Sequence, residues 1–239
     1  MQEAGEQPSA GQAPGLIESL AGRPVLVFGA AGALGGGIAA AFAQAGAAVT
    51  GIDRAEPPEG RREFGIRYVA ASAADEGAVS SLLDAGDPPW AVINTIGGFA
   101  PGKSLTELSE QELVGQLQLN LVTAALITKH ALRVMREVGE GRIVHTASRA
   151  AHVTAGTGFA YSVSKAAVLH LVRMAADEVR GTGVTVNCVV PSIIDTPANR
   201  AAMPDADHAG WPKVPVIART YVYLARPESG LINGAAVPV

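Results

Sequence analysis

The sequence predicts an α/β fold, a parallel sheet of about seven strands with helices on both faces. Two observations support this prediction: short apolar runs alternate with helical stretches along the chain, and 48% of the 239 residues are apolar. Alternating strands and helices imply crossover connections and therefore parallel strands. We expect residues 1–22 to form a flexible N-terminal tail and residues 23–239 to form a single domain.

The first half of the chain gives four strands. The run 25–28 is apolar throughout, as in strands buried on both faces. A glycine-rich turn follows it, and small residues then continue as a helix to a glycine at position 46. Strands 47–52 and 66–70 come next, then a short helix 75–85 and a fourth strand. That fourth strand, 89–95, ends at a Gly-Gly pair.

The second half begins with a long helical stretch, 109–138, which opens with a capping box of Ser109 and Glu112. A fifth strand, 141–146, leads to a helix at 159–179, which two glycines end before a sixth strand, 184–190. A polar segment, 198–212, precedes a helix at 214–225. The last apolar run, 231–237, is the predicted seventh strand.

Charge and cysteine content exclude several classes of function. The net charge is −4 and there is no basic stripe, which argues against binding to nucleic acid or to an anionic membrane surface. The single cysteine, Cys188, cannot form a disulfide within the chain. No basic residue precedes Arg23, so the N-terminus does not resemble a secretory signal. We therefore expect a cytoplasmic protein.

The glycine-rich turn after the first strand predicts a dinucleotide site. Gly29, Gly32 and Gly35 lie between a strand and a helix, and Asp53 ends the next strand. Glycines let the backbone approach a pyrophosphate at the helix N-terminus, and an acid in this position can hold ribose hydroxyls and repel a 2′-phosphate. Asp53 thus favours NAD(H), whereas Arg54 beside it leaves NADP(H) possible. This arrangement predicts a doubly wound Rossmann fold.

Two further strand ends lie on the same predicted edge of the sheet. Asn94 and Gly97 follow the fourth strand and are expected to face the cofactor, although a polar strand end with its turn explains them equally well. Asn120 lies among leucines in the middle of a helix, where an asparagine needs a hydrogen-bond partner or a function.

Tyr161 and Lys165 form the pattern that carries the predicted chemistry. Positions i and i+4 share one face of a helix, so the tyrosine hydroxyl and the lysine ammonium can enter one site. We expect the cation to lower the pKa of the phenol from about 10, so that it exchanges a proton with a substrate oxygen. Ser148, which follows the fifth strand, can hydrogen-bond the same oxygen. Chance occurrence of Tyr-x-x-x-Lys is the alternative.

Taken together and in order, these residues resemble the short-chain dehydrogenase/reductase family over about residues 23–237. The resemblance implies that Tyr161 is the general acid/base, that Lys165 lowers its pKa, that Ser148 orients the substrate oxygen and that Asn120 holds a water of a proton relay. It implies no metal, and it implies cofactor binding by Gly29, Gly32, Leu34, Gly35, Asp53, Asn94, Gly97, Tyr161, Lys165, Pro191, Ile194 and Thr196. The expected activity is NAD(P)(H)-dependent interconversion of a small carbonyl compound and a secondary alcohol.

Some features depart from the family pattern. The glycine spacing is closer to that of the dihydropteridine reductase branch, which generally lacks the serine kept here as Ser148. Ser72 stands where the family often has an aspartate near the adenine. A dihydropteridine-reductase-like enzyme and a non-catalytic dinucleotide sensor or scaffold are therefore the alternatives. The resemblance also implies a homodimer or homotetramer joined through the long helices.

Overall fold

The sheet has seven parallel strands in the order β3-β2-β1-β4-β5-β6-β7. The structure is a computed structural model that describes residues 20–57, 64–99, 104–153 and 158–239. The strands are β1 (Pro24–Phe28), β2 (Ala48–Asp53), β3 (Arg67–Ala70), β4 (Ala91–Asn94), β5 (Glu140–Thr146), β6 (Gly183–Val190) and β7 (Ala236–Pro238). This architecture confirms the predicted single-domain Rossmann fold.

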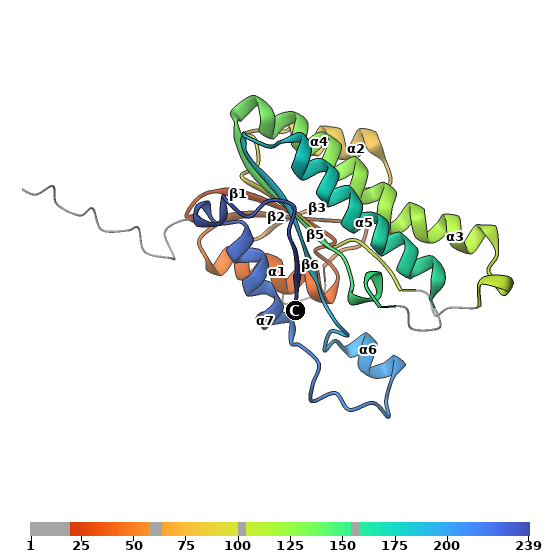
Figure 1. Cartoon of the computed structure of the whole chain (residues 1–239). Coiled ribbons are helices and arrows are strands. Elements are labelled where there is room, and N and C mark those ends of the chain that lie inside the picture. The colour runs from red at the N-terminus through yellow and green to blue at the C-terminus, as the bar shows by residue number, and fades with distance from the viewer. Residues whose placement is uncertain (1–19, 58–63, 100–103, 154–157) are drawn as a thin grey trace, which may run out of the picture.

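Helices cover both faces of the sheet (Figure 1). Helices α1 and α7 pack on one face and contact each other, while α2, α4 and α5 pack on the other. The helices are α1 (Ala33–Gln44), α2 (Glu76–Asp84), α3 (Glu110–Leu117), α4 (Thr123–Val138), α5 (Phe159–Glu178), α6 (Pro197–Ala202) and α7 (Val214–Leu224). Short 3₁₀ turns lie at Leu105–Glu107, Arg149–Ala151 and Pro227–Ser229.

The alternation of side chains along β1 explains how one apolar strand serves two cores. Val25 and Val27 are buried against α1 and α7. Leu26 and Phe28 are buried on the opposite face, among side chains of α2, α4 and α5. Because successive side chains of a strand point to opposite faces, a strand between two helical layers must be apolar at every position.

The strand order reverses at β1, since β2 and β3 lie on one side of it and β4 to β7 on the other. Ligands of doubly wound sheets bind outside the carboxyl ends of the strands at such a reversal. Here the Thr95 hydroxyl and backbone NH both donate to the Phe28 carbonyl, at 2.8 and 3.0 Å. The chain leaving β4 is thereby tied to the end of β1.

The predicted helix 109–138 is interrupted by a π-helical turn. Helix α3 begins after Ser109, whose capping box with Glu112 is present as predicted. The turn spans Gln118–Val122, and α4 continues directly from it. Such insertions place an extra residue in the helix and often occur at functional sites.

The seventh strand is shorter than predicted, because side-chain amides bind the backbone that leads into it. The Asn187 amide on β6 donates to the Ile232 carbonyl at 2.7 Å and accepts from Ala235 N at 2.9 Å. Asn233 accepts in turn from Val186 N. Only Ala236–Pro238 pairs as a strand, and Gly234 before it has a positive φ of 76°.

Two other boundaries differ from the predictions. Leu20 is fully buried, so the folded domain begins at least three residues before Arg23. Residues 1–19 of the predicted tail lie outside the described part of the chain. The predicted polar segment 198–212 contributes to a short helix, α6, because Thr196 caps it and Pro197 occupies its first turn.

Candidate active site

The glycine-rich turn places three glycines in three different roles. Gly29 has a φ of 86°, which favours glycine, and its NH donates to the Ile52 carbonyl at the end of β2. A Cβ on Gly35 would lie 2.1 Å from the Gly29 oxygen, so α1 approaches the turn too closely for any side chain there. Gly32, which precedes α1, is exposed and a Cβ on it would meet only the Gly29 oxygen. The turn therefore presents bare backbone at a helix N-terminus, as phosphate sites do.

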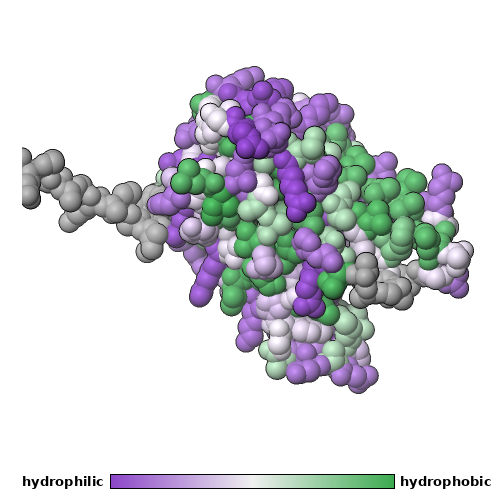
Figure 2. Space-filling model, in the orientation of Figure 1, coloured by the Kyte–Doolittle hydropathy of each residue, from purple (hydrophilic) through white to green (hydrophobic). Residues whose placement is uncertain are grey.

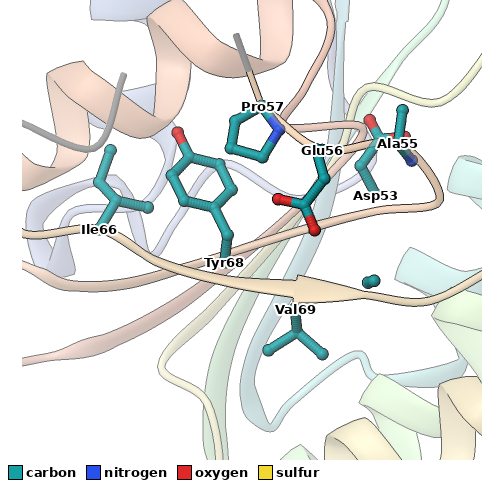
Figure 3. A pocket seen from close by; sticks show the side chains of 8 residues that line it. Asp53, Ala55, Glu56, Pro57, Ile66, Tyr68 and Val69 are labelled. Carbon is teal, nitrogen blue, oxygen red and sulfur yellow. Dashed lines mark hydrogen bonds between the residues drawn. The ribbon is translucent and has the colours of Figure 1, made fainter. Parts of the chain in front are cut away.

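Asp53 ties this turn to the end of β2. Its carboxylate accepts hydrogen bonds from the backbone NH groups of Ala31, at 3.0 Å, and Ala55, at 3.2 Å. Asp53 and Glu56 line one cavity of about 210 Å³. Figure 3 shows the Glu56 carboxylate between the Tyr68 ring and Asp53. The other residues that line the cavity are Ala55, Pro57, Ile66, Tyr68, Val69 and Ala70. Two carboxylates thus stand at the place predicted for the ribose.

Tyr161 and Ser148 meet where β5 ends and α5 begins. Ser148 follows β5 and caps the next 3₁₀ turn, accepting from Ala150 N at 3.2 Å. The side chains of Ser148 and Tyr161 line one cavity at this point. Burial raises the pKa of Tyr161, and the Ser148 side chain opposes that change without offsetting it. The phenol is therefore protonated at neutral pH.

Lys165 lies one turn further along α5 and points beneath the tyrosine. Its ammonium donates to the Thr146 carbonyl at 2.9 Å and lies 6.0 Å from the centre of the Tyr161 ring. Burial lowers the pKa of Lys165 to about 8. Burial determines the direction of the Tyr161 pKa, which is raised rather than lowered as predicted.

Asn120 occupies the π turn with its side chain fully engaged. Its amide oxygen accepts from Gly98 N at 3.1 Å, and its amide nitrogen lies 2.9 Å from Ser164 Oγ and 3.1 Å from Gln116 Oε1. A Cβ on Gly97 would lie 2.7 Å from Asn120 Oδ1 and 2.8 Å from Lys165 Nζ. The asparagine therefore joins three elements at the lysine.

A cavity of about 140 Å³ joins these residues into one site. Among the described residues that line it, Lys165 is the one with a charged side chain. The others are Thr95, Gly97, Gly98, Phe99, Thr146, Ala147, Ser148, Tyr161, Pro191, Ser192 and Ile194. Phe99 is 66% exposed and its ring meets that of Tyr161 edge to face, with centroids 5.2 Å apart. The mouth of the cavity thus has an apolar wall beside the phenol.

Seven residues predicted to bind the cofactor do not line this cavity: Gly29, Gly32, Leu34, Gly35, Asp53, Asn94 and Thr196. Asn94 is 2% exposed, and its side chain bonds inward to Ile96 N and His145 rather than facing the sheet edge. Thr196 uses its hydroxyl to cap α6, accepting from Asn199 N at 3.2 Å. Leu34 packs partly buried against the cluster under α1 and α7.

Sequence reasoning missed three residues that build the site. The Thr146 carbonyl binds Lys165, and Ser164 connects Asn120 to the Tyr161 carbonyl. His145 is buried below the strand ends and contacts Asn94. Polar residues inside an otherwise apolar strand or helix were the available signal, since such residues need partners when buried.

The residues present fit a nicotinamide dinucleotide. Exposed backbone at Gly32 can approach phosphates, the Asp53 carboxylate can accept from ribose hydroxyls, and exposed Gly97 leaves room beside Lys165. The described residues hold no group of three or more His, Cys, Asp or Glu side chains suited to a metal ion. None of the helices in the described ranges is long and apolar enough to cross a membrane.

Comparison with known families gives one extensive match. Residues 29–239 match the family model described as enoyl-(acyl carrier protein) reductase. The chain is 30% identical over 240 residues to cis-4-hydroxycyclohexanecarboxylate dehydrogenase of Sinomonas cyclohexanicum, covering 93% of this chain and 96% of that protein. It is 31% identical over 245 residues to D-threitol dehydrogenase of Mycolicibacterium smegmatis, covering 90% of each.

Solved structures share the whole fold. A crystal structure from Beutenbergia cavernae, provisionally assigned as an NAD(P)-dependent gluconate 5-dehydrogenase, superposes with a TM-score of 0.86 at 28% identity. The match covers 94% of this chain and 97% of that one, and the crystal holds NADP at low occupancy. The resemblance thus extends over the sheet, the glycine-rich turn and the tyrosine helix together.

Proposed function

Because the chain belongs to the short-chain dehydrogenase/reductase family, we propose that Tyr161, Ser148 and Lys165 carry its chemistry. It is an NAD(P)-dependent oxidoreductase that interconverts a carbonyl and an alcohol. One observation carries the assignment of roles. A largely buried phenol shares one cavity with a serine hydroxyl and a buried ammonium, at the carboxyl edge of the sheet.

In the direction of reduction, Tyr161 donates its proton to the substrate oxygen while the carbonyl carbon receives a hydride. A bound nicotinamide would supply that hydride, or would accept one in the reverse direction. In that direction Tyr161 takes the proton back. Ser148 holds the oxygen from a second side. Lys165 provides positive charge beneath the phenol as the proton leaves, and Asn120 keeps the Gly98 peptide against this group.

Tyr161→Phe tests this assignment. Loss of a positioned general acid typically costs about 10² to 10⁴-fold in rate, so we expect kcat to fall by that factor while nucleotide binding persists. Tyr223→Phe, at an exposed position on α7, is the matched control and should keep wild-type activity. Unchanged turnover in Tyr161→Phe would contradict the assignment. A wild type that binds nucleotide and reduces no carbonyl compound would favour the sensor alternative.

We propose that NAD(H) is the preferred nucleotide. Asp53 and Glu56 both line the cavity beyond the glycine-rich turn, whereas Arg54 is exposed and does not line it. Two carboxylates repel the extra negative charge of a 2′-phosphate. Asp53→Asn keeps an oxygen for Ala31 N and removes one charge. We expect it to raise kcat/KM for NADPH relative to NADH at least about tenfold, against the exposed control Glu228→Gln; an unchanged ratio would argue against a role for Asp53.

The substrate is proposed to be a secondary alcohol, or its ketone, with an apolar body. Phe99 and Ile194 line the catalytic cavity, and its one charged lining residue among those described is Lys165. A compact carbocyclic substrate, the class acted on by the Sinomonas relative, fits this lining better than a polyol does. Comparison of cyclohexanol with threitol as substrates tests the proposal, which faster turnover of the polyol would contradict.

We further propose a cytoplasmic homo-oligomer formed through the long helices. Figure 2 shows apolar side chains gathered over α3 and α5. Several are large and exposed, including Val114, Val163 and, at 60% exposure, Met174. Light scattering should give a dimer or tetramer, which Met174→Asp should weaken; a monomeric mass for the wild type would refute the proposal. Cell fractionation tests the location.

A further inference from the structure

His145 is a buried imidazole for which the chemistry above has no use. It lies one residue from the end of β5, is fully buried, and is paired in register with Asn94 on β4. Its Nδ1 atom lies 3.2 Å from Asn94 Nδ2, and its Nε2 atom lies 2.8 Å from the hydroxyl of Thr128 on α4. Both ring nitrogens therefore have a partner.

The partners determine which nitrogen carries the proton. The Thr128 hydroxyl has one proton and donates it to the Ala124 carbonyl at 2.7 Å, so it accepts from Nε2–H of His145. Nδ1 then carries a lone pair and accepts from the Asn94 amide nitrogen. The histidine is accordingly neutral, and burial together with the Lys165 charge lowers its pKa to about 4.

This arrangement fixes the orientation of the Asn94 amide. With its nitrogen directed to His145, the amide oxygen of Asn94 accepts from Ile96 N at 3.0 Å. A flipped amide would present an NH₂ group to the Ile96 NH and an oxygen to the His145 lone pair, so both bonds would be lost. The His145 lone pair thus determines whether the backbone NH of Ile96 has an acceptor.

Ile96 leads directly to the part of the loop that meets the catalytic groups. A Cβ on Gly97 would lie within 3 Å of both Asn120 Oδ1 and Lys165 Nζ, so this peptide passes too close to both groups to carry a side chain. Displacements of about 1 Å at such distances cost enzymes large factors in rate.

We propose that His145 is a positioning residue: through its Nδ1 lone pair it orients Asn94, and Asn94 in turn holds the Ile96–Gly97 backbone where Lys165 and the nicotinamide nucleotide require it. The nucleotide part of this inference rests on the proposed function. Its positioning part concerns the apoprotein alone and is tested separately below.

Two substitutions test the hydrogen bonds of the two ring nitrogens of His145 separately. Asparagine places an amide near the Nδ1 position, so His145→Asn keeps an acceptor for Asn94 and loses the bond to Thr128. Glutamine reaches the Nε2 position, so His145→Gln keeps a partner for Thr128 and loses the acceptor for Asn94. Thr128→Val is a third variant, which removes the hydroxyl without touching the Asn94 side.

The wild type and the three variants are compared by hydrogen exchange of the Ile96 amide and by NADH affinity in a fluorescence titration. Their kcat, KM and melting temperature are measured as well. We expect His145→Gln to lose Ile96 protection, to weaken NADH binding about tenfold, and to raise the KM for NADH more than it lowers kcat. His145→Asn and Thr128→Val should keep Ile96 protection and bind NADH within about twofold of the wild type.

Other outcomes overturn the inference. If all three variants lose thermal stability but keep Ile96 protection and NADH affinity, His145 is only a core residue. If all three lose affinity in step with stability, the effect is not specific to the Nδ1 side. A wild type that binds no NADH, with Ile96 protection changing as expected, would instead refute the proposed function and leave the positioning of the loop established.

Discussion

His145 should make the folded protein sensitive to weak acid. Its pKa is lowered from 6.5 to about 4, because the ring is buried and faces the Lys165 ammonium on α5. A second ring proton would also point at the Asn94 amide nitrogen on β4. Cys188, its register partner on β6, cannot balance that charge, because burial raises the pKa of the thiol to about 12 and keeps it neutral.

The sign and size of the effect follow from linkage. Between pH 6.5 and pH 4 the unfolded chain binds a proton that the folded chain does not, so stability is complete above pH 6.5 and is lost as the pH falls. A shift of this size corresponds to about 3 kcal/mol in total. About 2 kcal/mol of that is lost between pH 7 and pH 5, which for a chain of this length lowers the melting temperature by about 4 to 8 °C.

Thermal unfolding of wild type and His145→Asn at pH 7 and pH 5 measures this contribution. Both proteins keep the carboxylates that ion pairs hold at low pKa, such as Glu76, Asp84 and Asp195, so those groups cancel in the difference. The wild type should lose about 4 to 8 °C more than the variant at equal protein concentration. Equal losses, or a larger loss in His145→Asn, would show that His145 does not titrate as its surroundings require.

Three other predictions concern the catalytic cavity. Gly97→Ala should lower kcat about 100-fold with the fold retained by circular dichroism, because its Cβ would collide with Asn120 and Lys165; near-normal activity would contradict the packing described. Phe99→Ala should raise the KM for cyclohexanone about tenfold and that for acetone much less, since a small ketone gains little from the aromatic wall; equal changes would remove Phe99 from substrate recognition. Finally, because burial keeps the Tyr161 pKa above its ordinary value while Lys165 loses its charge near pH 8, the rate of alcohol oxidation should rise from pH 7 to about pH 8 in steady-state assays, and a maximum below pH 7 would disagree.

The proximity of Ser148, Tyr161 and Lys165 was predictable because it depends on local spacing and on one rule of sheet topology. Tyr161 and Lys165 share a helix face by periodicity alone. Ser148 follows a strand whose carboxyl end must lie at the ligand edge of a parallel sheet. In the observed parallel sheet, Ser148 follows β5 and lies near the start of α5, as this rule predicts.

Side-chain direction at strand ends was not predictable in the same way. The two-residue repeat of a strand predicts that neighbouring side chains point to opposite faces of the sheet. It does not predict which face of a fully buried sheet holds a polar partner. Asn94 was expected to face the cofactor, and it turns inward because His145 lies beside it, 51 positions later in the chain. The capping role of Thr196 was not predictable for a related reason: it precedes a six-residue helix that the polar composition of the segment concealed.

The pKa of Tyr161 shows how burial changes a conclusion drawn from charge alone. The sequence places a cation one helical turn from a phenol, and Coulomb attraction favours the phenolate. In the fold both groups lose hydration, which favours the neutral form of each. The pKa of Tyr161 therefore rises, and the pKa of Lys165 falls to about 8. Such a pair does not store a phenolate in advance. The ammonium stabilises the site most when negative charge develops on the substrate oxygen, during transfer of the phenol proton. Electrostatic stabilisation of that transition state is what accelerates a reaction.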